Sequence, residues 1–149
     1  MIRPLAAGDI EGLATDLAAL PLLARYGRSA RHIAGDLAAA LERGDGLVVH
    51  GDPAAGIAWF LPAGTFGLGG YLRLLAVTAA AQGRGTGAAL LAAFEAGVAD
   101  RSRHAFLLVS DFNQPAQAFY RKHGYAEVGR LPELVVAGID ELVYWKRLR

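Results

Sequence analysis

The 149-residue sequence contains no cysteine, so disulfides, thiolate metal ligands and a covalent cysteine intermediate are excluded. No apolar run approaches the ~20 residues that a membrane-spanning helix needs, and we expect no membrane partner. The formal net charge of +1 is too small to favour nucleic acid or anionic lipid as a partner. The stretch Met1–Pro4 lacks an apolar signal segment, which predicts a cytoplasmic location.

Serine and histidine are also scarce. The three serines are Ser29, Ser102 and Ser110. None of them lies in a Gly-x-Ser-x-Gly elbow, which argues against an acyl-serine intermediate. The four histidines are His32, His50, His104 and His123. They lie far apart without metal-ligand spacing, so we expect no metal site.

Two helices are predicted near the beginning of the chain. Apolar residues recur at helical spacing over 10–20, with Asp9 as a candidate N-cap and Pro21 as the end. A second helix is expected to begin after an N-cap at Ser29 and to end at Gly44.

A β-hairpin is predicted next, because Gly46–His50 and Gly56–Leu61 flank a turn at Gly51–Pro53. Residues 62–70 are rich in glycine and are expected to form a loop. Tyr71–Val77 is mostly apolar, as expected of a strand that is buried on both faces.

The second half of the chain predicts further alternation of helices and strands. A helix is expected over 88–98 and a buried strand over 105–109, which together imply a right-handed crossover and parallel pairing. A short helix follows, capped by Asn113 or Gln114. Strands are then expected over 125–128 and 140–148, as antiparallel neighbours at one edge of the sheet. The whole chain, 1–149, is therefore predicted to be one α/β domain.

The segment Gln82-Gly83-Arg84-Gly85-Thr86-Gly87 lies between the apolar strand and the predicted helix. Its three glycines let the backbone approach a ligand closely, because they have no Cβ. The unpaired N–H groups of the first helical turn would point at an anion bound there. The segment therefore predicts a phosphate-binding turn.

Two common phosphate-binding patterns fit this turn poorly. A Walker A loop needs a lysine after its last glycine, and none follows here. A Rossmann fingerprint needs Gly-x-Gly-x-x-Gly at the first strand-to-helix turn, whereas this turn has Gly-x-Gly-x-Gly and comes late in the chain. A nucleotide-binding regulator is kept as an alternative.

A third pattern fits over the whole chain. Gln82-x-x-Gly85-x-Gly87 resembles the acyl-CoA pyrophosphate loop of the GNAT N-acetyltransferase superfamily, and Asn113–Tyr125 resembles that family's second cofactor-side motif. The strand 71–77 is similar to its central strand. The resemblance implies a GNAT-like twisted, mixed central sheet of six to seven strands flanked by about four helices.

The resemblance also implies direct transfer of an acetyl group from the cosubstrate acetyl-CoA to a primary amine. The main-chain N–H of Val77 would stabilise the oxyanion, and Tyr120 would be the general acid for the leaving thiolate. The residues implied to bind the cofactor are Leu75, Ala76, Val77, Gln82, Gly83, Arg84, Gly85, Thr86, Gly87, Asn113, Ala116, Phe119 and Tyr120.

The general base is not assigned by the sequence. Many family members place a glutamate on the central strand, but this strand offers only Arg73 and no carboxylate. Substitute candidates are His50, His104, Asp111 and Glu133. A water relay without a dedicated base is the further alternative. The missing carboxylate also leaves open a non-catalytic acyl-CoA binding or sensing domain. A transferase of a longer acyl group is a separate alternative, which the depth of the pocket near the central strand would decide.

The resemblance implies that the acceptor binds on the side opposite coenzyme A, on a surface expected to include Tyr26, Trp59 and Phe66. Three arginines near the second helix, at positions 25, 28 and 31, hint at an acidic group on the acceptor. The other interpretation is that they form a solvated helix start. The resemblance makes a homodimer possible, and the amine remains unidentified.

Overall fold

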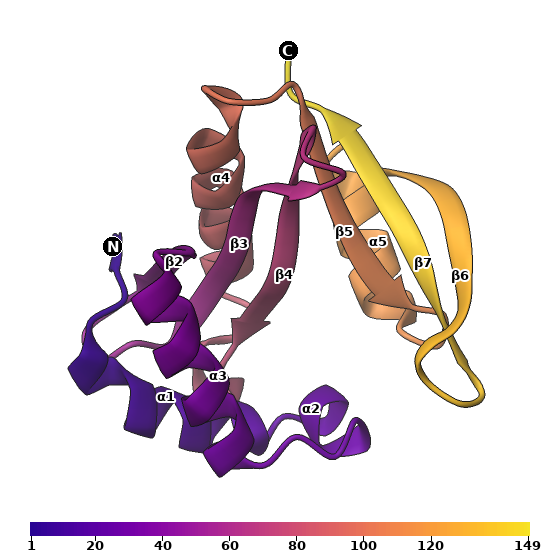
Figure 1. Ribbon diagram of the computed structural model, residues 1–149. Helices are drawn as coiled ribbons and strands as arrows, with labels where there is room; N and C mark the ends of the chain where they lie inside the picture. Colours follow the sequence, from indigo (N-terminus) through magenta and orange to yellow (C-terminus); the bar gives the residue numbers. More distant parts are fainter.

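The computed structural model describes residues 1–149 and contains one seven-stranded sheet in the order β1-β2-β3-β4-β5-β7-β6 (Figure 1). The strands are β1 (Ile2–Pro4), β2 (Gly46–His50), β3 (Gly56–Thr65), β4 (Gly69–Val77), β5 (His104–Ser110), β6 (Ala126–Val136) and β7 (Ile139–Arg147). The helices are α1 (Ile10–Ala18), α2 (Pro21–Arg25), α3 (Ala30–Arg43), α4 (Thr86–Ala99) and α5 (Gln114–Lys122), with the 3₁₀ turns η1 (Ala7–Asp9) and η2 (Ala79–Ala81). The predicted α/β class and mixed sheet are confirmed, since β4 and β5 pair in parallel and the other neighbours are antiparallel.

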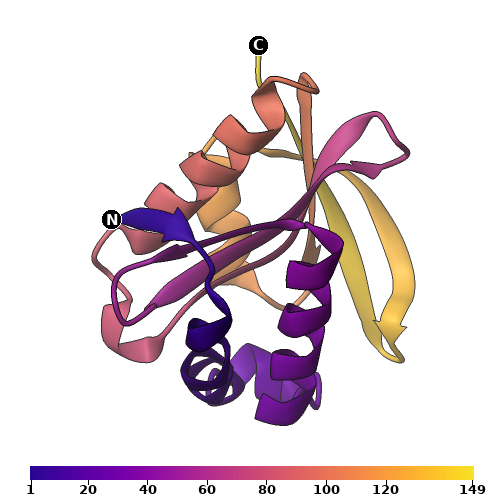
Figure 2. The same cartoon turned by 60° about the vertical axis from the view of Figure 1, so that its left-hand side comes forward.

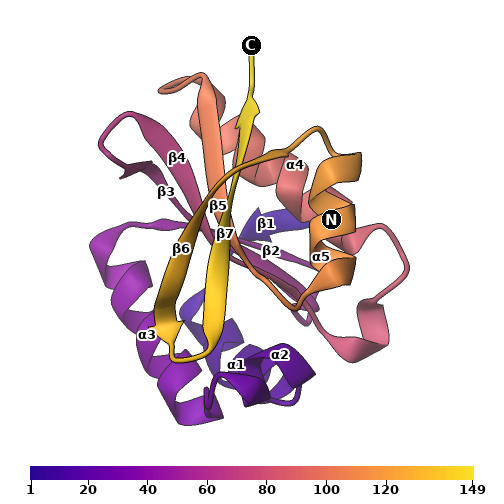
Figure 3. The ribbon, with the colours of Figure 1, turned by 90° about the vertical axis from the view of Figure 1, so that its right-hand side faces the viewer.

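Helices cover both faces of the sheet and create two separate cores. Along β3, Ile57 and Trp59 face a core formed with α1 and α3, whereas Ala58 and Phe60 face a core formed with α4 and α5. This alternation follows from the period of two in a strand. Figure 3 shows α1–α3 on one side of the sheet and α4 and α5 on the other. No helix combines the length and the apolar character required to span a membrane.

The sheet splits in its middle, between β4 and β5. These strands pair only where Gly70–Leu72 meets Ala105–Leu107. At the end of this pairing β4 has an irregularity, because Leu72 is opposite Phe60 and Leu74 is opposite Trp59, which leaves Arg73 as an extra residue. Such a bulge bends a strand and redirects a side chain. Beyond it β4 and β5 diverge, as Figure 1 shows, and residues of both strands line one of the two cavities described below.

Most predicted elements are found close to their expected positions. The hairpin of β2 and β3 is confirmed, and Ser29 caps α3 by accepting a hydrogen bond from the His32 N–H at 3.1 Å. Gly44 ends α3 in the left-handed region, with φ of 78°. The edge pair is confirmed too, with β6 outermost and antiparallel to β7.

Three local predictions are wrong. Pro21 does not end helical structure but begins α2, since proline fits the first helical turn. The expected loop over 62–70 is largely strand, because β3 and β4 continue into it as a hairpin. The Asp9 side chain does not cap α1; it instead accepts hydrogen bonds from Arg3 and from the Ala6 N–H.

Candidate active site

The predicted phosphate-binding turn is present between η2 and α4. Gly83 and Gly85 have φ angles of 78° and 79°, a left-handed backbone conformation that residues with a Cβ rarely adopt. Helix α4 has no side-chain cap, and its first intrahelical bond runs from the Ala89 N–H to the Gly85 carbonyl. The N–H groups of Thr86, Gly87 and Ala88 are therefore free for an anion, at the positive end of the helix dipole.

A cavity of about 600 Å³ lies against this turn. Ten of the thirteen predicted cofactor residues line it: Leu75, Val77, Gln82, Gly83, Gly85, Thr86, Gly87, Ala116, Phe119 and Tyr120. It also includes Lys122 and His123, which the sequence reasoning missed, and no acidic side chain. A cation beside uncapped N–H groups suits an anionic ligand.

The other three predicted cofactor residues lie elsewhere. Ala76 packs on the core of α1 and α3, because its side chain points to the opposite face of β4. Arg84 is exposed and does not line the cavity. Asn113 caps α5, its Oδ1 accepting from the Ala116 N–H at 3.2 Å, and it lines a second cavity instead.

The open edge of β4 supplies main-chain donors to the gap in the sheet. Just past the end of β4, the Thr78 N–H donates to the carbonyl of Ala55, the residue before β3, at 2.9 Å. Hydrogen-bonded and non-bonded pairs alternate in an antiparallel ladder. The register therefore directs the N–H groups of Leu75 and Val77 away from β3, toward the side where β5 no longer pairs.

Tyr120 lies where this cavity meets the second one. The two cavities share only Leu75, Ala116 and Tyr120. Helix α5 carries the tyrosine, and Gln117 of the same helix fixes that helix to the end of β5 by donating to the Ser110 and Asp111 carbonyls at 3.3 and 3.0 Å. Burial raises the pKa of the Tyr120 phenol well above its ordinary value of 10.0, so the side chain stays protonated.

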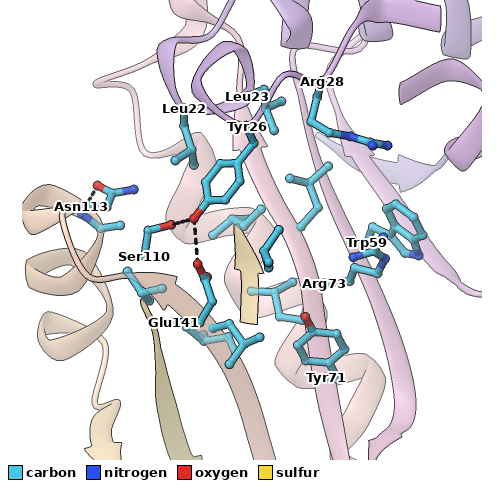
Figure 4. Close-up of a pocket in the computed structure, with 18 of the residues that line it drawn as sticks. Leu22, Leu23, Tyr26, Arg28, Trp59, Tyr71, Arg73, Ser110, Asn113 and Glu141 are labelled. Carbon is cyan, nitrogen blue, oxygen red and sulfur yellow. Dashed lines mark hydrogen bonds between the residues drawn. The ribbon is translucent and has the colours of Figure 1, made fainter. Parts of the chain in front are cut away.

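The second cavity, of about 670 Å³, lies on the other side of the split. Tyr26 and Trp59 line it as predicted, and Figure 4 shows both beside it. Phe66 does not. It occupies the turn between β3 and β4 with its side chain 88% exposed, at the hairpin tip that projects away from α1–α3 in Figure 2.

The sequence reasoning missed the main acidic group of this cavity, Glu141. Its side chain is only 6% exposed and accepts a hydrogen bond from the Tyr26 hydroxyl at 2.7 Å. Ser110 is hydrogen-bonded to the same hydroxyl, as Figure 4 shows. No lysine or arginine forms an ion pair with Glu141. The sequence contained one signal for Glu141, an acidic residue among the apolar residues of the last strand. The direction of the Glu141 side chain, however, depends on the pairing of Glu141 with Ser110.

None of the four candidate bases named from the sequence lines either cavity. His50 lies 3.0 Å from the N-terminal amine, and His104 accepts from the Trp145 indole N–H. Asp111 and Glu133 accept main-chain hydrogen bonds from Asp140 and Gly138. Each is therefore engaged in holding a strand or turn. No cluster of three or more acidic or histidine side chains suited to a metal ion occurs.

Two cavities that meet at one buried tyrosine define a site for two ligands, as expected for a group transferase. The sequence profile of the acetyltransferase (GNAT) domain matches residues 37–127. Because the match covers more than half of the chain, the protein belongs to the GNAT acetyltransferase family.

Solved structures agree with the fold. A GNAT-family protein of Desulfovibrio desulfuricans is 21% identical with a TM-score of 0.79, over 100% of this chain and 99% of that one. Ribosomal-protein-alanine N-acetyltransferase of Brucella melitensis is 19% identical with a TM-score of 0.77, over 99% of both chains. An aminoglycoside 6'-N-acetyltransferase in complex with coenzyme A is 18% identical with a TM-score of 0.77, over 100% of this chain and 97% of that one. No curated protein matches by sequence.

Proposed function

We propose that the protein is an N-acetyltransferase that moves the acetyl group of acetyl-CoA directly to a primary amine. The observation that carries the proposal is the meeting of the two cavities at Leu75, Ala116 and Tyr120. A thioester that enters from the glycine turn and an amine that enters from the opposite side would come together there. Their contact within one site needs no acyl-enzyme intermediate.

The cofactor diphosphate would bind to the main-chain N–H groups of the glycine turn and of the first turn of α4. Lys122 adds a positive charge to the same cavity. The pantetheine arm would extend along the open edge of β4, where the N–H groups of Leu75 and Val77 are available. In this arrangement the Val77 N–H is our candidate donor for the oxyanion that forms on the acetyl carbonyl.

Tyr120 would serve the leaving group. When the amine nitrogen bonds to the carbonyl carbon and the C–S bond breaks, the sulfur leaves as a thiolate. The buried phenol, kept protonated by its raised pKa, would donate a hydrogen bond and then its proton to that sulfur. A thiol has an ordinary pKa of ~8.5, so this transfer requires that the proton released by the amine returns to the phenol.

Glu141 would take the other proton of the acceptor nitrogen, the one that its ammonium form loses before attack. An amine arrives mostly as an ammonium ion, and it must lose a proton before it can attack. A buried carboxylate with only a phenol and no cation beside it attracts an ammonium group strongly. We therefore assign the base to β7 rather than to the central strand, acting directly or through one water molecule.

Thiol release from acetyl-CoA, measured with a panel of primary amines, tests this function. The proposal predicts turnover with at least one amine and an N-acetylated product by mass spectrometry. Coenzyme A binding without turnover of any amine would instead favour a sensing domain. Faster turnover of a longer acyl-CoA would assign a different acyl group.

We also propose that the protein forms a homodimer through the outer edge of β6. This strand is exposed along nearly its whole length and presents Val128, Leu134 and Val135, each more than half exposed. An unpaired edge with apolar side chains favours pairing with a second copy. Light scattering of the wild type and of Leu134→Lys tests this proposal, which predicts a dimer for the wild type and a monomer for the variant. If both proteins are monomers, the proposal is wrong.

A further inference from the structure

Arg73 occupies a special position in the acceptor cavity. It is the extra residue of the β4 bulge, at the level where β4 and β5 part. Bulges beside functional sites commonly redirect one side chain. Here the redirected side chain is a guanidinium group that lines the cavity, on the strand where relatives often carry an acid.

The guanidinium group of Arg73 contacts Trp59 and forms no salt bridge, while its positive charge helps to lower the pKa of Asp45. It lies over the Trp59 ring at 4.5 Å from the centroid, a cation–π contact that fixes its plane. Trp59 is in turn fixed by its indole N–H, which donates to Asp45 at 2.9 Å. Asp45 already pairs with Arg43, and Arg73 itself forms no salt bridge. Its N–H groups therefore remain available for a ligand.

The other arginines near the acceptor side are less suited to bind an acid. Arg28 also lines the cavity, but it is paired with Asp36. Arg25 lies over the Phe112 ring at 3.6 Å and does not line the cavity, and Arg31 is exposed outside it. The sequence suggested an acid-binding arginine near the second helix, whereas the structure favours Arg73 on the central strand β4.

The cavity consequently offers one unpaired group of each sign. Glu141 lies with Tyr26 and Ser110, and Arg73 lies with Trp59, on different walls in Figure 4. Between them the lining is mostly apolar, since 17 of its 23 residues are hydrophobic. A ligand that matches it has a cationic end, an anionic end and an apolar body.

We infer that the acceptor is an amine that also carries a carboxylate at its other end, as a short apolar peptide does. Its amine lies at Glu141, and its carboxylate binds Arg73, whose planar guanidinium matches a carboxylate with two hydrogen bonds. This inference rests on the proposed function and specifies the substrate class of the same site.

The test compares acceptors in pairs that differ only in the acid. Leucine, phenylalanine and the dipeptide Leu-Phe are each assayed against the corresponding C-terminal amide, with acetyl-CoA held constant. For the wild type we expect kcat/KM for the best acid to exceed that for its amide by about tenfold or more. The dipeptide should be the better acceptor, because leucine and phenylalanine carry amine and carboxylate on one carbon and cannot reach both walls of the cavity.

The variant Arg73→Gln should remove this preference by lowering kcat/KM for the acid about tenfold while leaving the amide nearly unchanged. Arg73→Lys should restore part of it, because it keeps the charge without the bidentate geometry. Arg31→Gln, which removes a charge outside the cavity, should keep the full preference. Melting temperatures of all variants show whether folding is retained.

Equal turnover of acids and amides by the wild type would overturn the inference while leaving the transferase function intact. A preference for acids that survives in Arg73→Gln would also overturn it. If no amine releases thiol, the proposed function itself fails. These outcomes are distinguishable because amide turnover reports catalysis independently of the carboxylate.

Discussion

The two cavities are built in different ways. The cofactor-side cavity presents mainly main-chain groups from one short turn and one helix start, with Lys122 as a neighbouring charge. The acceptor-side cavity presents side chains from α2, α3, β3, β4, β5, α5, β6 and β7, with charges of both signs. The two cavities therefore differ in whether main-chain or side-chain groups are offered to a ligand.

Helix starts show the same contrast on a smaller scale. Helix α3 is capped by Ser29 and α5 by Asn113, so a side chain satisfies an N–H group in each. Helix α4 begins at Thr86 after the N-cap Gly85 and has no side-chain cap, as is also true of α1 and α2. A helix end left unsatisfied in this way is stabilised when an anion binds to it. The difference between a cavity of main-chain groups at the glycine turn and a cavity of side chains around Glu141 can be tested by substitutions in each cavity.

The largest effect is expected from Glu141→Gln. Removing a general base typically costs ~10²-fold or more in rate, so kcat with the best amine should fall by at least that factor. Glutamine keeps an oxygen to accept from Tyr26, and coenzyme A affinity should stay unchanged. Glu133→Gln, which alters an exposed acid outside both cavities, is the control. A variant with wild-type kcat would remove Glu141 from the mechanism.

Tyr120→Phe should lower kcat by about ten- to a hundredfold, because the leaving sulfur loses its donor. Acetyl-CoA affinity should hardly change. Since burial raises the pKa of this phenol, the protonated form persists as pH rises, and wild-type kcat should show no decline from Tyr120 up to pH ~10. Steady-state kinetics over pH check both points; an unaltered kcat in the variant would contradict the role.

Gly87→Leu should weaken coenzyme A binding by about tenfold or more while retaining the fold. A Cβ at this position would lie 3.6 Å from Phe119, on the cavity wall, so a longer side chain would extend into the ligand space. The matched control is Gly87→Ala, whose methyl group fits and which favours the helix. Calorimetric titration of both variants with coenzyme A measures the effect. Equal affinities in the two variants would mean that coenzyme A does not bind at this turn.

The smallest effect is expected from Asp9→Asn, which touches neither cavity. The hydrogen bond from Arg3 lowers the pKa of Asp9 to about 2 from its ordinary 3.8. Because the pKa of Asp9 is lower in the folded state, the ionised carboxylate stabilises the folded protein above pH ~4. This contribution is lost as pH falls through about 2. We expect a loss of about 1 kcal/mol at neutral pH that shrinks toward pH 2, with unchanged kinetics. Denaturant unfolding at several pH values measures it.

The fold and the cofactor side could be predicted from the sequence because their signals are local. The glycines of 82–87 lie within one turn, and Ala116, Phe119 and Tyr120 lie on one short helix. Main-chain chemistry at a helix start depends on backbone geometry, which a short pattern can specify. Ten of the thirteen residues inferred in this way line the cavity.

The acceptor side could not be predicted because it depends on long-range pairing. Glu141 meets Tyr26 across 115 positions, through the register of β7 with β5. Arg73 enters the cavity through a one-residue bulge, which apolar periodicity does not reveal. Phe66 was misplaced for a related reason, since the hairpin that carries it extends beyond the sheet and exposes it.

The most direct test of the account is a calorimetric titration of the purified protein with acetyl-CoA. Main-chain binding of the diphosphate at the start of α4 predicts saturable heat with one site per chain, with affinity about tenfold or more weaker in Gly87→Leu and unchanged in Glu141→Gln. The absence of any heat at millimolar acetyl-CoA would contradict the assignment of the glycine turn, and with it the proposed reaction.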